Sequence, residues 1–155
     1  MQLHVYIDAT AYMPIDPKLA PLGVTVQRIA LGVMFLAHSV WLKLIVFTLP
    51  GTAQYFASMG LPNWLAYVVF IMEAIGGMML VLGVQTRWVA VLLIPVLLGA
   101  TWAHSGNGWM FSYENGGWEY PAYLTLLAIS QFLLGDGRYS LSPSKALAPT
   151  LNGGP

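Results

Sequence analysis

The sequence predicts an all-α polytopic membrane protein: a bundle of four transmembrane helices with a short interfacial helix between the first two. Of its 155 residues, 57% are hydrophobic and only 8% are charged, whereas a soluble domain usually carries about 25% charged residues. Four long apolar runs are separated by stretches rich in glycine, proline and polar residues, and about 20 apolar residues suffice to cross a bilayer. The chain is therefore predicted to be embedded in a lipid bilayer.

The N-terminal residues 1–22 are expected to form a surface segment. Prolines at its C-terminal end disfavour a long helix, and no basic stretch precedes an apolar core, so the segment does not resemble a cleaved signal peptide. The first transmembrane helix is expected at about 23–48, ending before Pro50-Gly51. Arg28 and Lys43 lie near its two ends, where they are expected to extend their charges to opposite membrane interfaces.

The second transmembrane helix, expected at about 64–83, carries Glu73 in the middle of an apolar run. An isolated charge at that depth costs at least ~2.5 kcal/mol, so Glu73 is expected to face other protein. Gly76 and Gly77 lie on the same helix face, where they allow another backbone to approach closely. Before this helix, residues 52–63 mix aromatic and small polar side chains and predict the short interfacial helix.

The third transmembrane helix is expected at about 87–104 and the fourth at about 118–134. Pro95 is expected to kink the third without breaking it, and Pro121 is accepted in the first turn of the fourth. Residues 135–155 are expected to form a polar tail with little to bury. The expected organisation is thus a surface segment 1–22, a membrane domain 23–134 and a tail 135–155.

The basic residues predict the orientation. Four spans place both termini on one side of the membrane, and five of the six basic residues belong to that side, which leaves Lys43 for the other. This bias predicts that both termini are cytoplasmic. A formal net charge of zero and the absence of a basic cluster argue against nucleic acid as a partner.

Each of the four helices places an ionisable side chain in the outer half of the predicted bundle, whereas the inner half is expected to be almost purely apolar. The residues are His38, Lys43, Glu73, His104 and Glu119. Tyr123 shares the helix face of Glu119. On an α-helix, His38 and Lys43 would lie about 140° apart, so the sequence leaves their convergence open.

Each of these residues also has a purely structural interpretation. Glu73 could be an ion-paired acid that fixes helix packing, and His38 a core histidine bonded to a backbone carbonyl or to Glu73. Lys43 could be an interfacial anchor. His104 and Glu119 could simply cap helix ends. The functional interpretation therefore rests on the group of residues rather than on any one of them.

Several motifs resemble the DoxX family of small four-helix bacterial membrane proteins, over about residues 24–141. They are the His38-x4-Lys43 helix end, Phe56-x3-Gly60-Leu61-Pro62, Glu73-x2-Gly76-Gly77, the Thr86-Arg87 turn, His104, and Gly116-Gly117-Trp118-Glu119-Tyr120. The polar positions of the family are matched by His38, Lys43, Glu73, Arg87, His104 and Glu119. The resemblance implies a location in the bacterial cytoplasmic (inner) membrane and an association with quinone-linked oxidation of sulfur compounds such as thiosulfate.

The first functional hypothesis is a subunit of a membrane redox complex whose outer-half pocket binds quinone or a small polar substrate. His38 and Glu73 would exchange protons, since histidine titrates near neutral pH. Lys43 and His104 would stabilise negative charge on a quinol oxygen, with Glu119 and Tyr123 completing the substrate site. The partners expected are the lipid bilayer and other membrane subunits or further copies of the chain.

The sequence limits the cofactors. It contains no cysteine, so a thiolate-bound redox centre is excluded and an electron donor is expected on another polypeptide. Haem between His38 and His104 is disfavoured because the two residues lie at different depths, and a metal held by His38, Glu73, His104 and Glu119 is equally disfavoured. The alternative function is a non-catalytic structural or assembly subunit of a larger complex. A small-solute permease is a weaker third interpretation because the polar cluster is one-sided.

Overall fold

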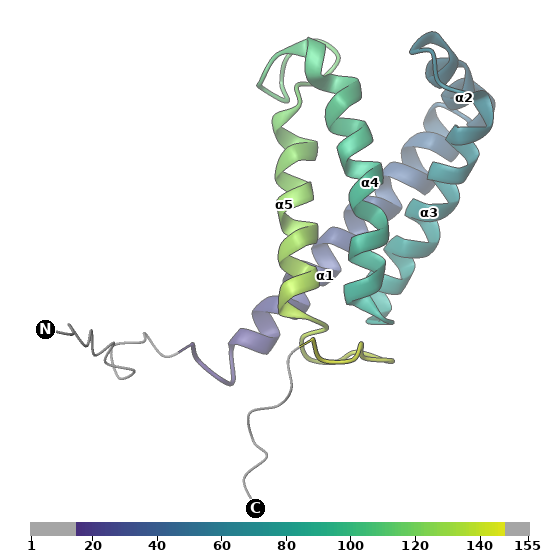
Figure 1. Ribbon diagram of the computed structural model, residues 1–155. Coiled ribbons are helices and arrows are strands. Elements are labelled where there is room, and N and C mark those ends of the chain that lie inside the picture. The colour runs from purple at the N-terminus through teal and green to yellow at the C-terminus, as the bar shows by residue number, and fades with distance from the viewer. Residues whose placement is uncertain (1–14, 148–155) are drawn as a thin grey trace, which may run out of the picture.

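The computed structural model describes residues 15–147, and every regular element in that range is helical (Figure 1). The elements are α1 (Ala20–Leu36), the π-helix η2 (Ala37–Val46), α2 (Leu49–Ser58), α3 (Asn63–Leu82), α4 (Thr86–His104), the short 3₁₀ helix η3 (Ser105–Asn107) and α5 (Glu119–Leu134). The predicted all-α class is confirmed, and α2 occupies the place of the expected short helix. Residues 1–14 and 148–155, which include most of the expected surface segment and the end of the expected tail, lie outside the described range.

Three stretches of the described chain are long and apolar enough to cross a membrane: Ala20–Val46, Asn63–Leu82 and Thr86–Asn107. The fourth expected span, α5, has 16 residues, or about 24 Å of helix, and packs along α4. A fourth crossing by α5 is an inference from that packing. Large apolar side chains such as Ile75, Leu92 and Leu126 are more than half exposed on the outer surface, as expected where lipid covers the bundle.

The helices form two pairs, α1 with α3 and α4 with α5. The first pair crosses at Gly32 and Gly77, so closely that a Cβ added to Gly77 would lie 2.9 Å from the carbonyl oxygen of Gly32. A Cβ on Gly76 would meet the side chain of Leu93 from α4 at 2.9 Å. The expectation that the face of α3 bearing Glu73 is an interior face, opened by two glycines, is therefore confirmed.

The first transmembrane helix changes its winding halfway, because α1 continues without interruption into the π-helix η2. The amide of Phe47 donates to the carbonyl of Leu42 at 2.8 Å, an i→i+5 hydrogen bond. Near the start of η2, the hydroxyl of the fully buried Ser39 donates a hydrogen bond to the carbonyl of Phe35 at 2.8 Å. π-helices are rare and are found mostly at functional sites.

The described part of the expected polar tail packs against the bundle, so the expectation that it buries little is wrong for that part. Asp136 is 8% exposed and accepts four hydrogen bonds: from the amide (3.1 Å) and hydroxyl (2.6 Å) of Thr86, and from the amide (2.9 Å) and hydroxyl (3.1 Å) of Ser144. The backbone of 141–142 bonds to residues 82–85 at the α3–α4 turn, and residue 138 bonds to Pro21. These contacts tie the four long helices together at the end of the bundle where the described chain begins and ends (Figure 1). This end is called the inner end, after the predicted orientation, and the opposite end the outer end.

Arg28 corrects two further expectations. It is 1% exposed, its guanidinium lies against Gly83, and its Nη2 donates to the carbonyl of Tyr139 at 3.4 Å. Its charge therefore reaches the end of the bundle but is not exposed there, because the C-terminal segment covers it. With Thr25, Gln131 and Asp136 also buried nearby, the inner half of the bundle ends in a polar cluster and is not purely apolar.

We expect Gly77→Ala to destabilise the protein by about 1–3 kcal/mol, the usual effect of overpacking, because the new methyl group would push α1 and α3 apart. Thermal unfolding in detergent measures the change. Gly99→Ala is the matched control: a Cβ there meets nothing within 4 Å, and alanine favours the helix over glycine. Equal melting temperatures for wild type and Gly77→Ala would contradict the close crossing.

Acid should weaken the inner-end cluster. Burial alone would raise the pKa of Asp136, but the hydrogen bonds from Thr86 and Ser144 outweigh it and hold this pKa below its usual value of 3.8. A lowered native pKa gives stability that is complete above the unfolded-state pKa and is lost as pH falls through the native one. The melting temperature should therefore drop as the pH falls below about 4, and the drop should be smaller in Asp136→Asn. An identical acid dependence in both proteins would show that another group controls it.

Candidate functional site

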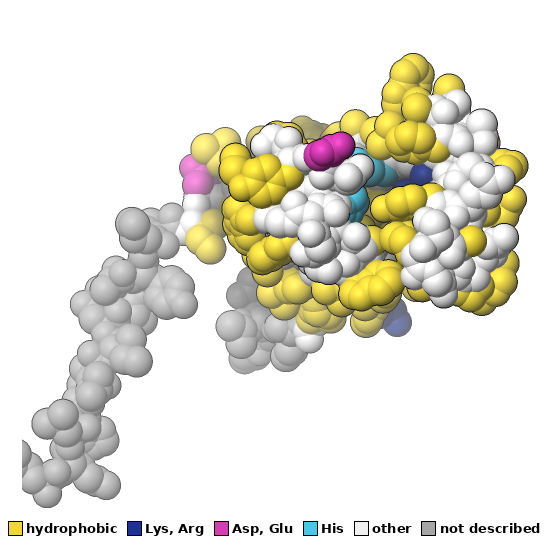
Figure 2. Space-filling view, turned by 90° about the horizontal axis from the view of Figure 1, so that it is seen from above, with side chains coloured by type: hydrophobic (Ala, Val, Ile, Leu, Met, Phe, Trp, Pro, Cys, Tyr) yellow, Lys and Arg dark blue, Asp and Glu magenta, His cyan; other side chains and the backbone are white. Residues whose placement is uncertain are grey.

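A cleft of about 1050 Å³ separates the two helix pairs and contains most of the predicted site residues. The pairs meet at the inner end and diverge toward the end that carries α2 and the 105–118 loop (Figure 1). Viewed from that outer end, histidine side chains and a basic side chain lie in a hollow, with an acidic side chain at its rim (Figure 2). The walls are mainly aliphatic and aromatic, with a few polar groups at defined positions, which is the usual composition of a small-molecule site.

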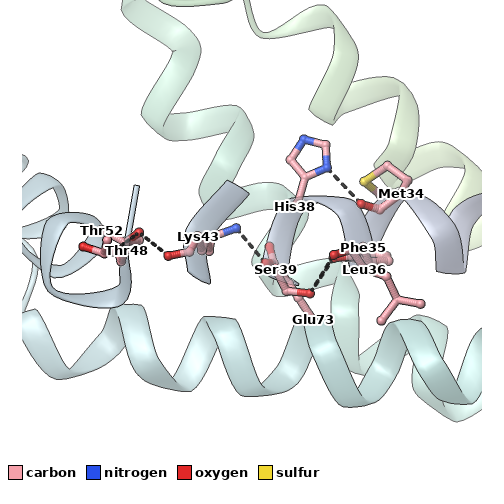
Figure 3. A network of polar contacts seen from close by, with 9 residues as sticks. All are labelled: Met34, Phe35, Leu36, His38, Ser39, Lys43, Thr48, Thr52 and Glu73. Atoms are coloured by element: carbon pink, nitrogen blue, oxygen red, sulfur yellow. Dashed lines mark hydrogen bonds and ion pairs between the residues drawn. The ribbon is translucent and has the colours of Figure 1, made fainter. Parts of the chain in front are cut away.

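The central polar element is an ion pair between Lys43 of η2 and Glu73 of α3, with Nζ and Oε2 2.6 Å apart (Figure 3). Their side chains are 17% and 7% exposed. The expectation that Lys43 extends to the interface is wrong: it turns inward, because Glu73 needs a partner at this depth. The hydroxyl of Thr52 in α2 lies 2.9 Å from the carbonyl oxygen of Thr48 and 3.4 Å from that of Lys43, so a shared hydrogen bond connects α2 to the same site.

His38 lies on the cleft wall one π-helical turn from Lys43. Its Nδ1 is 2.9 Å from the carbonyl oxygen of Met34, and a carbonyl only accepts, so Nδ1 carries the proton in the neutral ring. The Nε2 atom is then an acceptor, and Figure 3 shows it on the side of the ring away from Met34. The ring of Tyr120 from α5 lies roughly parallel to the imidazole, with the centroids 6.2 Å apart.

The π-helix decides how His38 and Lys43 are placed. In an α-helix they would point about 140° apart, but hydrogen bonds between residues five apart bring such residues close to one face. Both side chains line the same cleft. The angular separation expected from the sequence is therefore wrong, and the two groups converge.

His104 lies at the outer mouth of the cleft. Its Nδ1 is 3.0 Å from the carbonyl of Asn115 and 3.2 Å from that of Gly116. The amide of Asn107 donates to the same two carbonyls at 3.0 and 2.8 Å. The proton of neutral His104 is therefore on Nδ1, and Nε2 is left as an acceptor.

The structure does not bring Glu119 and Tyr123 to this cleft. Glu119 accepts a hydrogen bond from the amide of Phe111 at 3.0 Å, which fixes the outer loop. Tyr123 is 60% exposed. Both line a separate apolar groove of about 510 Å³ beside Trp109 and Trp118.

Arg87, a further polar position of the resemblance, lies at the opposite end of the bundle, where its Nη1 donates to the carbonyls of Phe132 (2.6 Å) and Leu133 (3.0 Å). The sequence reasoning missed Tyr120, which lines the cleft in place of Tyr123. Nothing in the sequence distinguished Tyr120 as a cleft residue, because the rotation of α5 about its axis is set by packing between helices.

Within residues 15–147, no three His, Cys, Asp or Glu side chains lie close enough together to hold a metal ion. The four-residue set His38, Glu73, His104 and Glu119 is therefore not assembled, since Glu119 faces away. What the site offers is one ion pair and two imidazole acceptors in apolar walls. That arrangement suits proton exchange and hydrogen bonding with an organic ligand.

The ion pair should show as a coupling energy. Lys43→Met and Glu73→Gln should each destabilise the protein, because each leaves one buried charge unpaired, whereas the double variant should recover most of the loss. A double-mutant cycle by unfolding in detergent should give a coupling of roughly 1–3 kcal/mol. Additive losses would mean that the two charges do not act as a pair.

Comparison with known proteins identifies the chain. The DoxX family model matches residues 23–106. CatD of Bacillus subtilis (strain 168), named "Putative oxidoreductase CatD", is 39% identical over 84 residues, which cover 54% of this chain and 60% of CatD. The Escherichia coli (strain K12) "Inner membrane protein YqjF" is 32% identical over 133 residues, or 80% of this chain and 92% of that protein.

No solved structure matches the chain. The match to the family model covers more than half of the sequence and includes most of α1 and all of η2, α3 and α4. The ion pair and both histidines of the cleft lie on η2, α3 and α4. The chain spans only three fifths of CatD but nearly all of YqjF. It is a membrane protein of the DoxX family.

Proposed function

We propose that the protein is an accessory subunit of a membrane redox system and that its cleft binds the head of a quinone. The observation that carries this proposal is the Lys43–Glu73 ion pair set in an apolar cleft of about 1050 Å³, with His38 on the wall. A relative named as an oxidoreductase, CatD, supports a redox role.

The donors and acceptors of the cleft fit both redox forms of such a ligand. A quinone ring carries carbonyl oxygens, which need donors, and the Lys43 ammonium is a charged donor on the cleft wall. A quinol carries hydroxyl groups, which need acceptors, and the Nε2 atoms of His38 and His104 are free to accept. Tyr120 adds an aromatic face beside His38, against which a flat ring could stack.

The chemistry assigned to the residues is proton handling. Converting a quinone to a quinol takes up two electrons and two protons, and the reverse reaction releases them. His38 and Glu73 would give or take the protons, while Lys43 and, in its protonated form, His104 would stabilise negative charge developing on oxygen. Because the sequence holds no cysteine, the electron donor or acceptor is assigned to another polypeptide of the complex.

The proposed location is the bacterial inner membrane, as the name of YqjF states for that relative. Both ends of the described chain lie at the same end of the bundle (Figure 1). The basic residues Arg87, Arg138 and Lys145 belong to that end. The positive-inside rule then assigns this end to the cytoplasm and the mouth of the cleft to the opposite side.

Binding of a tail-free quinone, 2,3-dimethoxy-5-methyl-1,4-benzoquinone, to the full chain in nanodiscs tests the proposal. Wild type should show saturable quenching of tryptophan fluorescence, since Trp102 lines the cleft. The His38→Ala variant and the neutral double variant Lys43→Met/Glu73→Gln should each bind about tenfold more weakly, equivalent to ~1.4 kcal/mol. Tyr123→Phe, outside the cleft, is the control and should bind as wild type does.

Saturable binding that survives both cleft variants would place the quinone elsewhere and overturn the proposal. Absence of saturable binding in wild type would favour the alternative, a non-catalytic assembly subunit. In that case the same cleft variants should change co-purification with partner subunits and leave turnover of the assembled complex intact.

A further inference from the structure

α3 and α4 form two neighbouring walls of the cleft. The two helices are joined at the inner end by a tight turn with left-handed backbone at Gly83 (φ 74°) and Gln85 (φ 46°). From this turn they diverge toward the outer end (Figure 1). Pro95 lies halfway along α4, where the ring prevents a helical hydrogen bond and favours a kink. Both helices contribute walls to the cleft, which lies between their diverging outer halves.

On the α4 side, the cleft wall beside Trp102 includes two residues with little side chain. Pro95 and Gly99 are exposed although both line the cleft, and a Cβ built on Gly99 meets nothing within 4 Å. On the α3 side, Val68 also lines the cleft and is 38% exposed. Gly99 and Val68 are thus exposed cleft residues of two helices long and apolar enough to cross a membrane. The region between these two residues is called the slot.

The size and polarity of the cleft indicate which kind of ligand fits it. Pockets for drug-sized ligands have volumes of ~300–1,000 Å³, and this cleft, at about 1050 Å³, lies just above that range. A small polar substrate would occupy only the region of Lys43, Glu73 and His38 and would leave the apolar walls in contact with water. A ligand with an apolar tail would cover those walls as well.

We propose that the ligand enters sideways from the bilayer: its polar head reaches the Lys43–Glu73 pair, and its hydrocarbon tail stays in the slot between Gly99 and Val68. This inference rests on the proposed function and narrows it from quinones in general to membrane-dissolved, tailed ones. The slot acts mainly as a passage, because moving a tail from lipid into an apolar slot changes its surroundings little.

Filling the slot tests the inference with two probes, the tail-free quinone above and its decyl homologue. Binding to the full chain in nanodiscs is measured by fluorescence quenching. Gly99→Leu should weaken binding of the decyl probe by about tenfold or more and change binding of the tail-free probe by less than about twofold. Gly23→Leu is the matched control, since a Cβ at Gly23 also meets nothing within 4 Å and Gly23 is not part of the cleft.

A second pair of variants guards against local misfolding at Gly99. Val68→Trp should reproduce the selective loss of the decyl probe from the opposite wall. Ile71→Trp, on an exposed position of α3 away from the cleft, should not. Far-ultraviolet circular dichroism and melting temperature confirm that each variant is folded.

The outcomes separate the two proposals. If the tail-free probe binds wild type and both probes respond equally to Gly99→Leu and Val68→Trp, or neither responds, the slot is wrong and the head site stands. If the tail-free probe shows no saturable binding to wild type, the quinone site and the slot that depends on it are both wrong. Only a selective loss of the tailed probe supports side entry.

Discussion

A carboxylate in the middle of an apolar helix must be matched by a partner, and the structure of this protein is arranged around that requirement. Glu73 lies near the centre of α3 and is 5% exposed. Its partner, Lys43, belongs to a different helix and would otherwise extend toward the membrane surface. Pairing the two draws η2 against α3 beside α2, and it leaves a strongly polar group in a wall that is otherwise apolar.

Two backbone features make this pairing compatible with helix packing. The glycines at the α1–α3 crossing allow the helices to approach closely at the inner half. Beyond the crossing, the change from α1 to the π-helix η2 turns the helix surface so that His38 and Lys43 face one cleft. The buried hydroxyl of Ser39, bonded back to Phe35, lies at this transition. Serine bonded in this way tends to bend a helix, and here it accompanies a change of winding.

The two ends of the bundle differ in packing and therefore in what they can do. At the inner end, Asp136 and the segment after it connect α1, α3, α4 and α5 through backbone and side-chain hydrogen bonds. At the outer end the helix pairs separate, and the cleft lies between them. The hydrogen bonds at the inner end fix the positions of the helices, and the separated helix pairs at the outer end leave the cleft free of side chains. This is the arrangement expected of a preorganised binding pocket.

The sequence by itself determined the fold class and the membrane environment, because composition and the length of apolar runs report directly on the solvent. It also determined that Glu73 and the neighbouring glycines face the interior of the bundle, because a charged side chain exposed to lipid costs too much free energy. Only the tertiary structure decided which polar residues meet. Helix rotation and winding depend on contacts between helices, so the convergence of His38 and Lys43, the replacement of Tyr123 by Tyr120 and the exclusion of Glu119 could not be predicted from spacing. The role of Asp136 and the burial of Arg28 were hidden for the same reason: a short polar segment far along the chain covers the inner end, and no periodic pattern reports such a long-range contact.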